Sequence, residues 1–344
     1  MPYGVKALRK LQFGRETTAG STTAATTVWR GEGVIEDTRK VEFPVEDVGY
    51  VSGITRAYQP MLGAQIGLSA TPATFEQLPH IFEMGVATTS GVRDTTGSTD
   101  YIYTYTMPTT AGTFLAATSS AIPTKAYSIQ GGDNNSAEVV EFCHATDFEL
   151  SFKAGEALMM SATIQGRQAI VQAFTAGQTA PTVAEILGSQ AKFYIDAVGG
   201  TIGTTQITNE VIAASLKVKT GLKAVATADG NLYFSFIKGT KPEVMLDITF
   251  EHSTAAAAQK VIWRAGTAQL FQLKFVGPAG TAPAGATYPN KTLKINLAGN
   301  YEKFSALEED DGDDTITATI RGGYNTTAAQ FCSFVVANEL SVLP

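Results

Sequence analysis

The side chains that most often carry chemistry are few in this chain and lie far apart. Its three histidines, His80, His144 and His252, have no cysteine or second histidine at the spacing of metal ligands. No HExxH, CxxC, GxxxxGK[ST] or GxSxG pattern occurs, and Gly31 and Gly33 lack the third glycine of a dinucleotide-binding turn. We therefore predict no catalytic site and no cofactor. We interpret His80 as a helix-surface residue and His144 as a strand-end residue.

An acidic cluster surrounds Gly312 near the end of the chain. The simplest interpretation is a solvated loop between two strands. Carboxylates beside a turn glycine are also the ligand type that calcium prefers, although their spacing here departs from the DxDxDG loop. Both interpretations stay open. The cluster consists of Glu308, Glu309, Asp310, Asp311, Asp313 and Asp314, of which Glu308, Asp310, Asp311 and Asp313 are the candidate metal ligands.

The composition argues against several classes of protein. A net charge of −7 disfavours a protein that binds nucleic acid through phosphate contacts, which need a basic face. The chain has no apolar run long enough for a transmembrane helix, and residues 1–14 lack the apolar centre of a signal peptide. Two cysteines, Cys143 and Cys332, are too few for a disulfide scaffold. We expect free buried thiols, with one distant disulfide as the alternative.

Period-two alternation of apolar and polar residues recurs along the chain and predicts half-buried strands. Thr is frequent at the polar positions, where its β-branch favours an extended backbone. Charged residues make up only 17% of the chain, against about 25% in typical domains, which suggests that some surface is buried against other copies. The alternating rows are residues 101–105, 148–152, 158–164, 244–250, 271–275, 293–297 and 316–320.

Two segments have helical spacing instead. The first is 71–85, with Thr71 as its cap, Pro72 as its first residue and an irregularity at Pro79. The second is 253–266, capped by Ser253 and followed by a run of alanines that favours helix. Each segment follows a strand-like stretch, with Ile66 and Leu68 before the first and Ile248 and Phe250 before the second.

The two halves of the chain match each other in three collinear blocks, which indicates an internal duplication. Convergent β-sheet composition is the alternative. We expect a first domain over 1–176, a linker over 177–185 and a second domain over 186–344. The blocks pair Ile66, Leu68 and Thr71 with Ile248, Phe250 and Ser253; Pro123, Lys125, Ile129 and Asn134 with Pro289, Lys291, Ile295 and Asn300; and residues 161–164 with residues 317–320.

Segments 33–50 (GVIEDTRKVEFPVEDVGY) and 73–85 resemble the N-terminal region of tail tube proteins from long, non-contractile-tailed bacteriophages. Segment 147–168 (DFELSFKAGEALMMSATIQGRQ) is similar to the closing strands of their first domain. The resemblance covers a minority of the chain and is family-like rather than chemically diagnostic. It implies a mostly-β fold of two tandem β-sandwich or barrel domains, each flanked by one α-helix.

The resemblance also implies a non-enzymatic virion protein, assembled in the cytoplasm of the bacterial host. Inner strands of each subunit would join those of its neighbours into a continuous barrel. A tandem-domain chain would form trimeric rings with pseudo-sixfold symmetry, stacked helically into the tube that conducts DNA. Its partners would be further copies, the tape-measure protein and DNA in the lumen, and tail terminator and distal tail proteins at the ends. No membrane partner is expected.

Two long segments without a core pattern are the expected contacts between rings. They are 16–27, with Thr17, Thr22 and Thr26, and 86–98, with Thr89, Arg93 and Thr96. Deletion of residues 17–26 is expected to leave a folded subunit that cannot extend tubes. The acidic cluster would face the lumen or a neighbouring ring, and a neutral or acidic wall would let DNA slide.

Two other classes of protein are the alternatives to this expectation. A secreted or surface-layer β-sandwich adhesin is disfavoured by the missing signal peptide and disulfides. A carbohydrate-active β-sandwich enzyme or binding module needs paired carboxylates beside exposed aromatic rings. The chain has only Trp29 and Trp263, and no such pairing is visible.

Overall fold

The computed structural model describes residues 3–109, 124–281, 283, 285–310 and 312–344. Strands make up 48% of the residues and helices 8%, so the expectation of a mostly-β fold is confirmed. All seven alternating rows lie in or directly beside strands. The strands of the first half are β1 (Lys10–Arg15), β2 (Thr27–Val28), β3 (Gly33–Asp37), β4 (Lys40–Glu42), β5 (Tyr58–Met61), β6 (Ala64–Pro72), β7 (Val92–Arg93), β8 (Tyr101–Thr106), β9 (Tyr127–Gly132), β10 (Ala137–Lys153), β11 (Met159–Gly166) and β12 (Ala169–Val171).

The second half contributes the remaining strands. They are β13 (Ala191–Ala197), β14 (Gln206–Ile207), β15 (Val211–Lys219), β16 (Leu222–Val225), β17 (Phe236–Gly239), β18 (Glu243–Glu251), β19 (Gln269–Ala279), β20 (Asn290–Phe304), β21 (Glu308–Asp310), β22 (Asp313–Gly322) and β23 (Cys332–Asn338). The helices of the described residues are α1 (Leu78–Gly85) and α3 (Thr254–Arg264), with short 3-10 turns at Lys6–Leu8 and Gly188–Gln190.

One antiparallel sheet runs through both halves in the order β3-β6-β11-β10-β15-β18-β22-β20, and we call it the long sheet. The strands β10 and β20 are long enough to leave it and join a second sheet in each half. The outer sheet of the first half has the order β2-β1-β9-β10-β12. The outer sheet of the second half has the order β14-β13-β19-β20-β23-β8-β7.

The core fills the space between the long sheet and the outer sheets. In β18, buried and half-buried residues alternate along the strand, so one face carries Val244, Leu246, Ile248 and Phe250 inward. Buried side chains from both halves belong to one continuous cluster. Removing apolar area from water stabilises a fold by about 25 cal/mol per Å². The burial that stabilises each half is therefore shared with the other.

The two helices differ in how well the sequence predicted them. The helix α3 begins and ends as expected, because the Ser253 hydroxyl accepts hydrogen bonds from the Ala255 and Ala256 amides at 3.1 Å each. The helix α1 begins seven residues later than the predicted cap Thr71, since β6 continues to Pro72. Pro79 therefore lies in the first turn, where no amide donor is needed, and it does not disturb the helix middle.

The order of strands repeats between the halves. The order β3-β6-β11-β10 in the first matches β15-β18-β22-β20 in the second. The register repeats as well. His144 lies opposite Gln165 and Asn300 opposite Arg321, an offset of 156 on both strands, and both ladders skip one residue, Thr146 or Glu302.

This register supports one predicted block and corrects the others. Residues 161–164 and 317–320 occupy equivalent positions on β11 and β22. Ile66 is equivalent to Leu246 rather than to Ile248, because they lie opposite Ile164 and Ile320. The middle block is wrong: Ile129 lies on β9, whereas Ile295 lies on β20, the strand in the place of β10. Pro123 of that block lies outside the described residues.

The predicted linker is fastened to the first half at its C-terminal end. The Ala184 amide donates to Glu76 at 2.7 Å, and the Ala184 carbonyl accepts from the Phe75 amide at 3.1 Å. Ile186 is buried, and its amide donates to the Ala73 carbonyl at 2.9 Å. These contacts limit how the chain passes from one half to the other.

Candidate assembly surfaces

The halves meet edge to edge where β10 pairs with β15 over seven residue pairs, from Asp147–Lys219 to Lys153–Ala213. On the open face of the long sheet, Asp147 lies opposite Lys219 and Glu149 opposite Lys217. Opposite charges in directly facing positions stabilise a strand pair by about 0.2–1 kcal/mol. On the other face, Phe148 and Leu150 meet Val218 and Leu216 in the core. We call this pairing the internal junction.

The strands equivalent to β10 and β15 end the long sheet and have a free edge. At one end, β3 pairs only with β6; at the other, the C-terminal part of β20 pairs only with β22 in the described part of the chain. Free edges present unpaired backbone donors and acceptors to any strand that fits. The chain therefore contains one internal junction and, at the two ends of the long sheet, the two edges that could form a second junction of the same kind.

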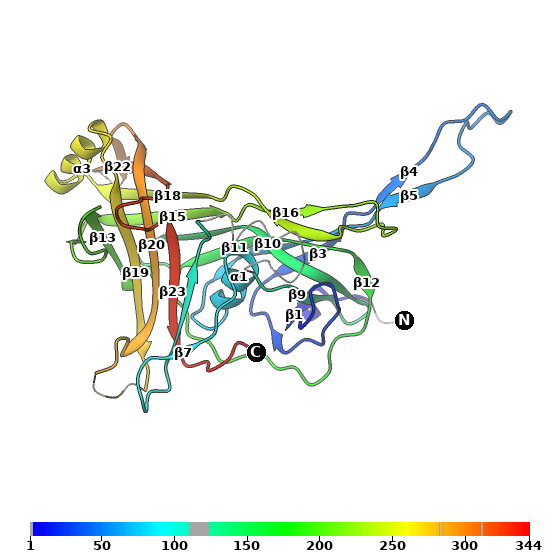
Figure 1. Ribbon diagram of the computed structural model, residues 1–344, viewed down its shortest axis with the longest axis horizontal. Helices are drawn as coiled ribbons and strands as arrows, with labels where there is room; N and C mark the ends of the chain where they lie inside the picture. Colours follow the sequence, from blue (N-terminus) through cyan, green and yellow to red (C-terminus); the bar gives the residue numbers. More distant parts are fainter. Residues whose placement is uncertain (1–2, 110–123, 282, 284, 311) are drawn as a thin grey trace.

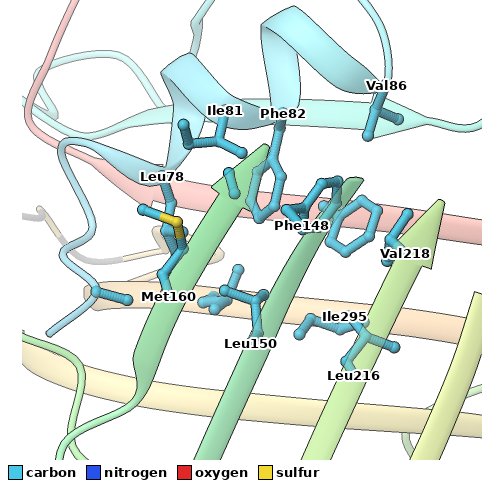
Figure 2. Close-up of a cluster of buried hydrophobic side chains, with 14 of the residues drawn as sticks. Leu78, Ile81, Phe82, Val86, Phe148, Leu150, Met160, Leu216, Val218 and Ile295 are labelled. Carbon is cyan, nitrogen blue, oxygen red and sulfur yellow. The ribbon is translucent and has the colours of Figure 1, made fainter. Parts of the chain in front are cut away.

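The helix α1 fills the space beside the internal junction. Its apolar side chains point at the strands of both halves, and Figure 2 shows Phe82 above Phe148, with Leu216 and Val218 of β15 alongside. The Phe82 ring stacks on Phe334 of β23 at 4.5 Å and lies 5.6 Å from Phe148. A residue of the second half thus covers the helix of the first.

Polar contacts and an exchanged strand reinforce this junction. Lys291 of the second half contacts Glu76 at 2.7 Å and Glu339 at 3.2 Å, and the Asn338 side-chain amide donates to the Phe75 carbonyl at 2.8 Å. The strand β8 leaves the first half to extend the outer sheet of the second by pairing with β23. The predicted tyrosine row lies here, with Tyr103 and Tyr105 buried against the core.

The open face of the long sheet is polar and nearly balanced in charge. Ser215 donates to Glu149 at 2.7 Å, Thr319 donates to Asp247 at 2.6 Å, and Lys219 contacts Glu243 at 3.4 Å. These cross-strand contacts leave no apolar core pattern on this face. Its charged residues, identified by their registers and by the Arg321–Glu302 ion pair at 2.9 Å, are Glu36, Asp147, Glu149, Glu243, Asp247, Glu251 and Glu302 against Lys153, Lys217, Lys219, Lys303 and Arg321.

A long hairpin between β3 and β6 projects far from the body of the molecule (Figure 1). We call residues 38–63 the arm. Glu46 holds its tip through Arg56 at 2.7 Å and through the Thr55 hydroxyl at 3.0 Å. The arm exposes a dense set of large apolar side chains, which is the mark of an interaction surface. They are Val41, Phe43, Val45, Val48, Tyr50, Val51, Ile54, Tyr58 and Met61.

Sequence reasoning missed the arm as a contact surface. Alternation at Val41, Phe43 and Val45 reads like an ordinary half-buried strand. One signal could have identified the arm. The apolar residues that follow, around the turn glycines Gly49 and Gly53, have no partner segment that would face them in the core. Both glycines adopt positive φ, +82° and +62°, where other residues are strained.

The two segments predicted as ring contacts lie against their own chain. Thr22 donates to Glu141 at 3.1 Å, Thr26 donates to the Phe13 carbonyl at 3.4 Å, and Thr17 is exposed. Between them Ala25 is buried. In the second segment, β7 pairs with β8. Thr89 is half-buried, and Arg93 and Thr96 are exposed. The candidates are therefore surface residues on anchored loops rather than on a free extension.

The acidic cluster forms the hairpin between β21 and β22. Glu308 pairs with Thr315 and Asp310 with Asp313, and Gly312 takes φ +92° at the turn. Asp311 lies outside the described residues. Among the residues that are described, no group of three or more His, Cys, Asp or Glu side chains could hold a metal ion. The predicted ligands Glu308 and Asp313 therefore belong to no such group.

Both predictions for the histidines were wrong, because His80 is buried rather than on the helix surface and His144 lies inside β10 rather than at a strand end. His80 faces inward on α1, with Nδ1 3.0 Å from the Tyr127 hydroxyl, and burial lowers its pKa to about 3. His144 lies within β10, and burial lowers its pKa to about 4. Next to His80, the buried Glu83 carboxylate accepts from Arg15 at 2.6 Å and from Tyr127 at 2.6 Å. This network ties α1 to the outer sheet.

The free thiols Cys143 and Cys332 are buried and unpaired with each other, as expected. Burial raises the pKa of Cys143, which disfavours the reactive thiolate. In the described residues no helix is both long and apolar enough to cross a bilayer. No protein-family model and no curated protein sequence matches this chain.

Proposed function

We propose that this protein is a structural subunit that joins copies of itself edge to edge into rings, and that the rings stack into a phage tail tube. One observation carries the proposal. The strand order and register repeat, and the two repeats join at the internal junction. Among the described residues, the equivalent edges, the C-terminal end of β20 and β3, have no second strand beside them. An internal duplication into two tandem domains explains this repetition.

The internal junction supplies a template for the contact between copies. Glu149 lies opposite Lys217, and Glu36 is the equivalent of Lys217 on β3. The offset of 156 assigns the place of Glu149 to Ser305, the residue directly after the end of β20. In the second junction Ser305 of one copy lies opposite Glu36 of the next. Lys303 of the first copy then lies diagonal to Glu36 of the next copy. The basic residue is therefore on β20 and the acidic residue on β3. This reverses the internal arrangement and keeps opposite charges together.

Repeated junctions of this kind are heterologous, so they close into a ring when the rotation per copy divides a full turn. Three chains would supply six similar sheets, the pseudo-sixfold arrangement that the resemblance implies. Closure leaves no free strand edge, which removes the cost of unpaired backbone groups. The ring needs no covalent link.

The open face of the long sheet would form the wall of the lumen. Its balanced charges offer DNA no continuous basic track, and phosphate contacts to Lys and Arg are what hold DNA to a surface. DNA and a tape-measure protein could then move along the wall without tight binding. The β21–β22 hairpin, which carries the acidic residues Glu308–Asp310, lies at the β20 edge of this sheet.

The arm is the surface we assign to stacking between rings. Val45 is 80% and Tyr50 70% exposed, and burying such side chains stabilises association by about 1.5–3 kcal/mol each when burial is complete. The loops at 16–27 and 86–98 are anchored to their own chain and become secondary candidates. Tail terminator and distal tail proteins would cover the arms or their acceptor surfaces at the two ends.

Site-directed cross-linking tests the edge contact. A Ser305→Cys variant and a Glu36→Cys variant are mixed and oxidised, and a disulfide-linked dimer is expected only in the mixture. An Asp37→Cys variant mixed with Ser305→Cys is the matched control, because Glu36 and Asp37 are neighbours on β3 and point to opposite faces. Electron microscopy should show rings or tubes. Equal cross-linking in both mixtures, or solitary subunits at every concentration, would refute the proposal.

A further inference from the structure

The helices α1 and α3 follow equivalent strands but differ in burial. Every residue of α1 is buried, whereas Ala256 is the buried residue of α3. Each helix makes the same contact to its own half: Phe82 lies 5.6 Å from Phe148, and Trp263 lies 5.5 Å from Phe304, the equivalent phenylalanine. Phe82 and Trp263 therefore occupy equivalent positions.

The difference comes from what covers each helix. Phe334 of β23 stacks on Phe82 at 4.5 Å, and β23 belongs to the half that contributes β15 to the internal junction. Among the described residues, Phe304 is the aromatic ring that contacts Trp263, which is half-buried. Val261 on the same helix is 63% exposed, and α3 lies at the end of the molecule away from the arm (Figure 1).

The repeat identifies the residue equivalent to Phe334. Phe334 lies opposite Ile295 of β20, and Ile170 of β12 lies opposite Val139 of β10, the position 156 residues earlier. Ile170 is 37% exposed, although an isoleucine in the place of Phe334 would be covered. Ile170 also belongs to the same half as β3, the strand that presents the free edge.

We infer that β12 of a second copy covers α3, with Ile170 of that copy packed on Trp263. This inference rests on the proposed pairing between β20 and β3. Within one chain, the pairing of β15 with β10 places β23 over α1. In the same way, β3 of the second copy, paired with β20, would place its β12 over α3. The second copy completes an apolar site that one chain leaves half-built.

Tryptophan quenching and one charged variant test this contact in the full chain. Trp29 is already buried, so acrylamide-sensitive emission reports on Trp263. Assembly should reduce the quenching several-fold. Ile170→Glu should leave the thermal unfolding of the monomer unchanged and raise the concentration needed for assembly at least tenfold. Val171→Glu is the matched control, because its side chain is 81% exposed and points to the opposite face of β12.

The outcomes separate this inference from the proposed function. Loss of quenching together with impaired assembly of Ile170→Glu supports both. Normal assembly with unchanged quenching and no difference between Ile170→Glu and Val171→Glu overturns the α3 contact and leaves the edge pairing intact. Absence of self-association in the unmodified chain at any concentration overturns both.

Discussion

Replacing Phe82 by alanine tests whether the halves share one core. The side chain is fully buried, and its ring contacts the rings of Tyr105 at 5.6 Å, Phe148 at 5.6 Å and Phe334 at 4.5 Å. Truncating a buried phenylalanine costs about 3–5 kcal/mol, because contacts are lost and a cavity remains. We expect the midpoint of thermal unfolding to fall by about 4–7 °C in a chain of this size.

Differential scanning calorimetry measures this shift and the number of transitions. Since Phe82 joins both halves, the whole chain should unfold earlier, in one transition. A double-mutant cycle of Phe82→Leu with Phe334→Leu should give a coupling of about 0.5–1.5 kcal/mol for the stacked pair. Trp263→Ala is the matched control, and it should lower the midpoint far less because its position lacks a cover. Two separate transitions, of which one moves, would refute the shared core.

Three further predictions follow from buried polar groups and the arm. Arg15→Met should destabilise the fold by about 3–5 kcal/mol in urea unfolding, because it strands the buried Glu83 carboxylate, and the added Glu83→Met should restore part of that loss. The pKa of His144 is lowered to about 4 in the folded state, so neutral His144 contributes about 3 kcal/mol to the free energy of unfolding above pH 6.5. This contribution is lost as the pH falls toward 4. His144→Leu should therefore make the urea midpoint depend less on pH over that range. Replacing 41–60 with a short turn should leave the unfolding midpoint and ring formation unchanged and abolish tubes by electron microscopy, and tubes of normal length would remove the stacking role from the arm.

The sequence located the strands well because the signal is local. A strand with one buried face repeats its apolar residues at every second position, and the rows at 148–152 and 244–250 carry this pattern without reference to any partner. The same holds for α3, whose cap Ser253 lies directly before the helix. The matched segments 161–164 and 317–320 also fell on equivalent strands.

The tertiary structure decided what each of these elements faces, since burial against a distant segment leaves no local mark. His80 reads as a polar helix residue, yet its burial follows from Tyr127 and the outer sheet. The apolar alternation of the arm resembles any strand, and only the fold leaves it without a core. The pairing of β10 with β15, and the free edges it leaves on β3 and β20, depend on which strands meet across long sequence separations. Composition and periodicity therefore determined a mostly-β chain that includes the helices α1 and α3, whereas the edges available to another copy were set by long-range pairing alone.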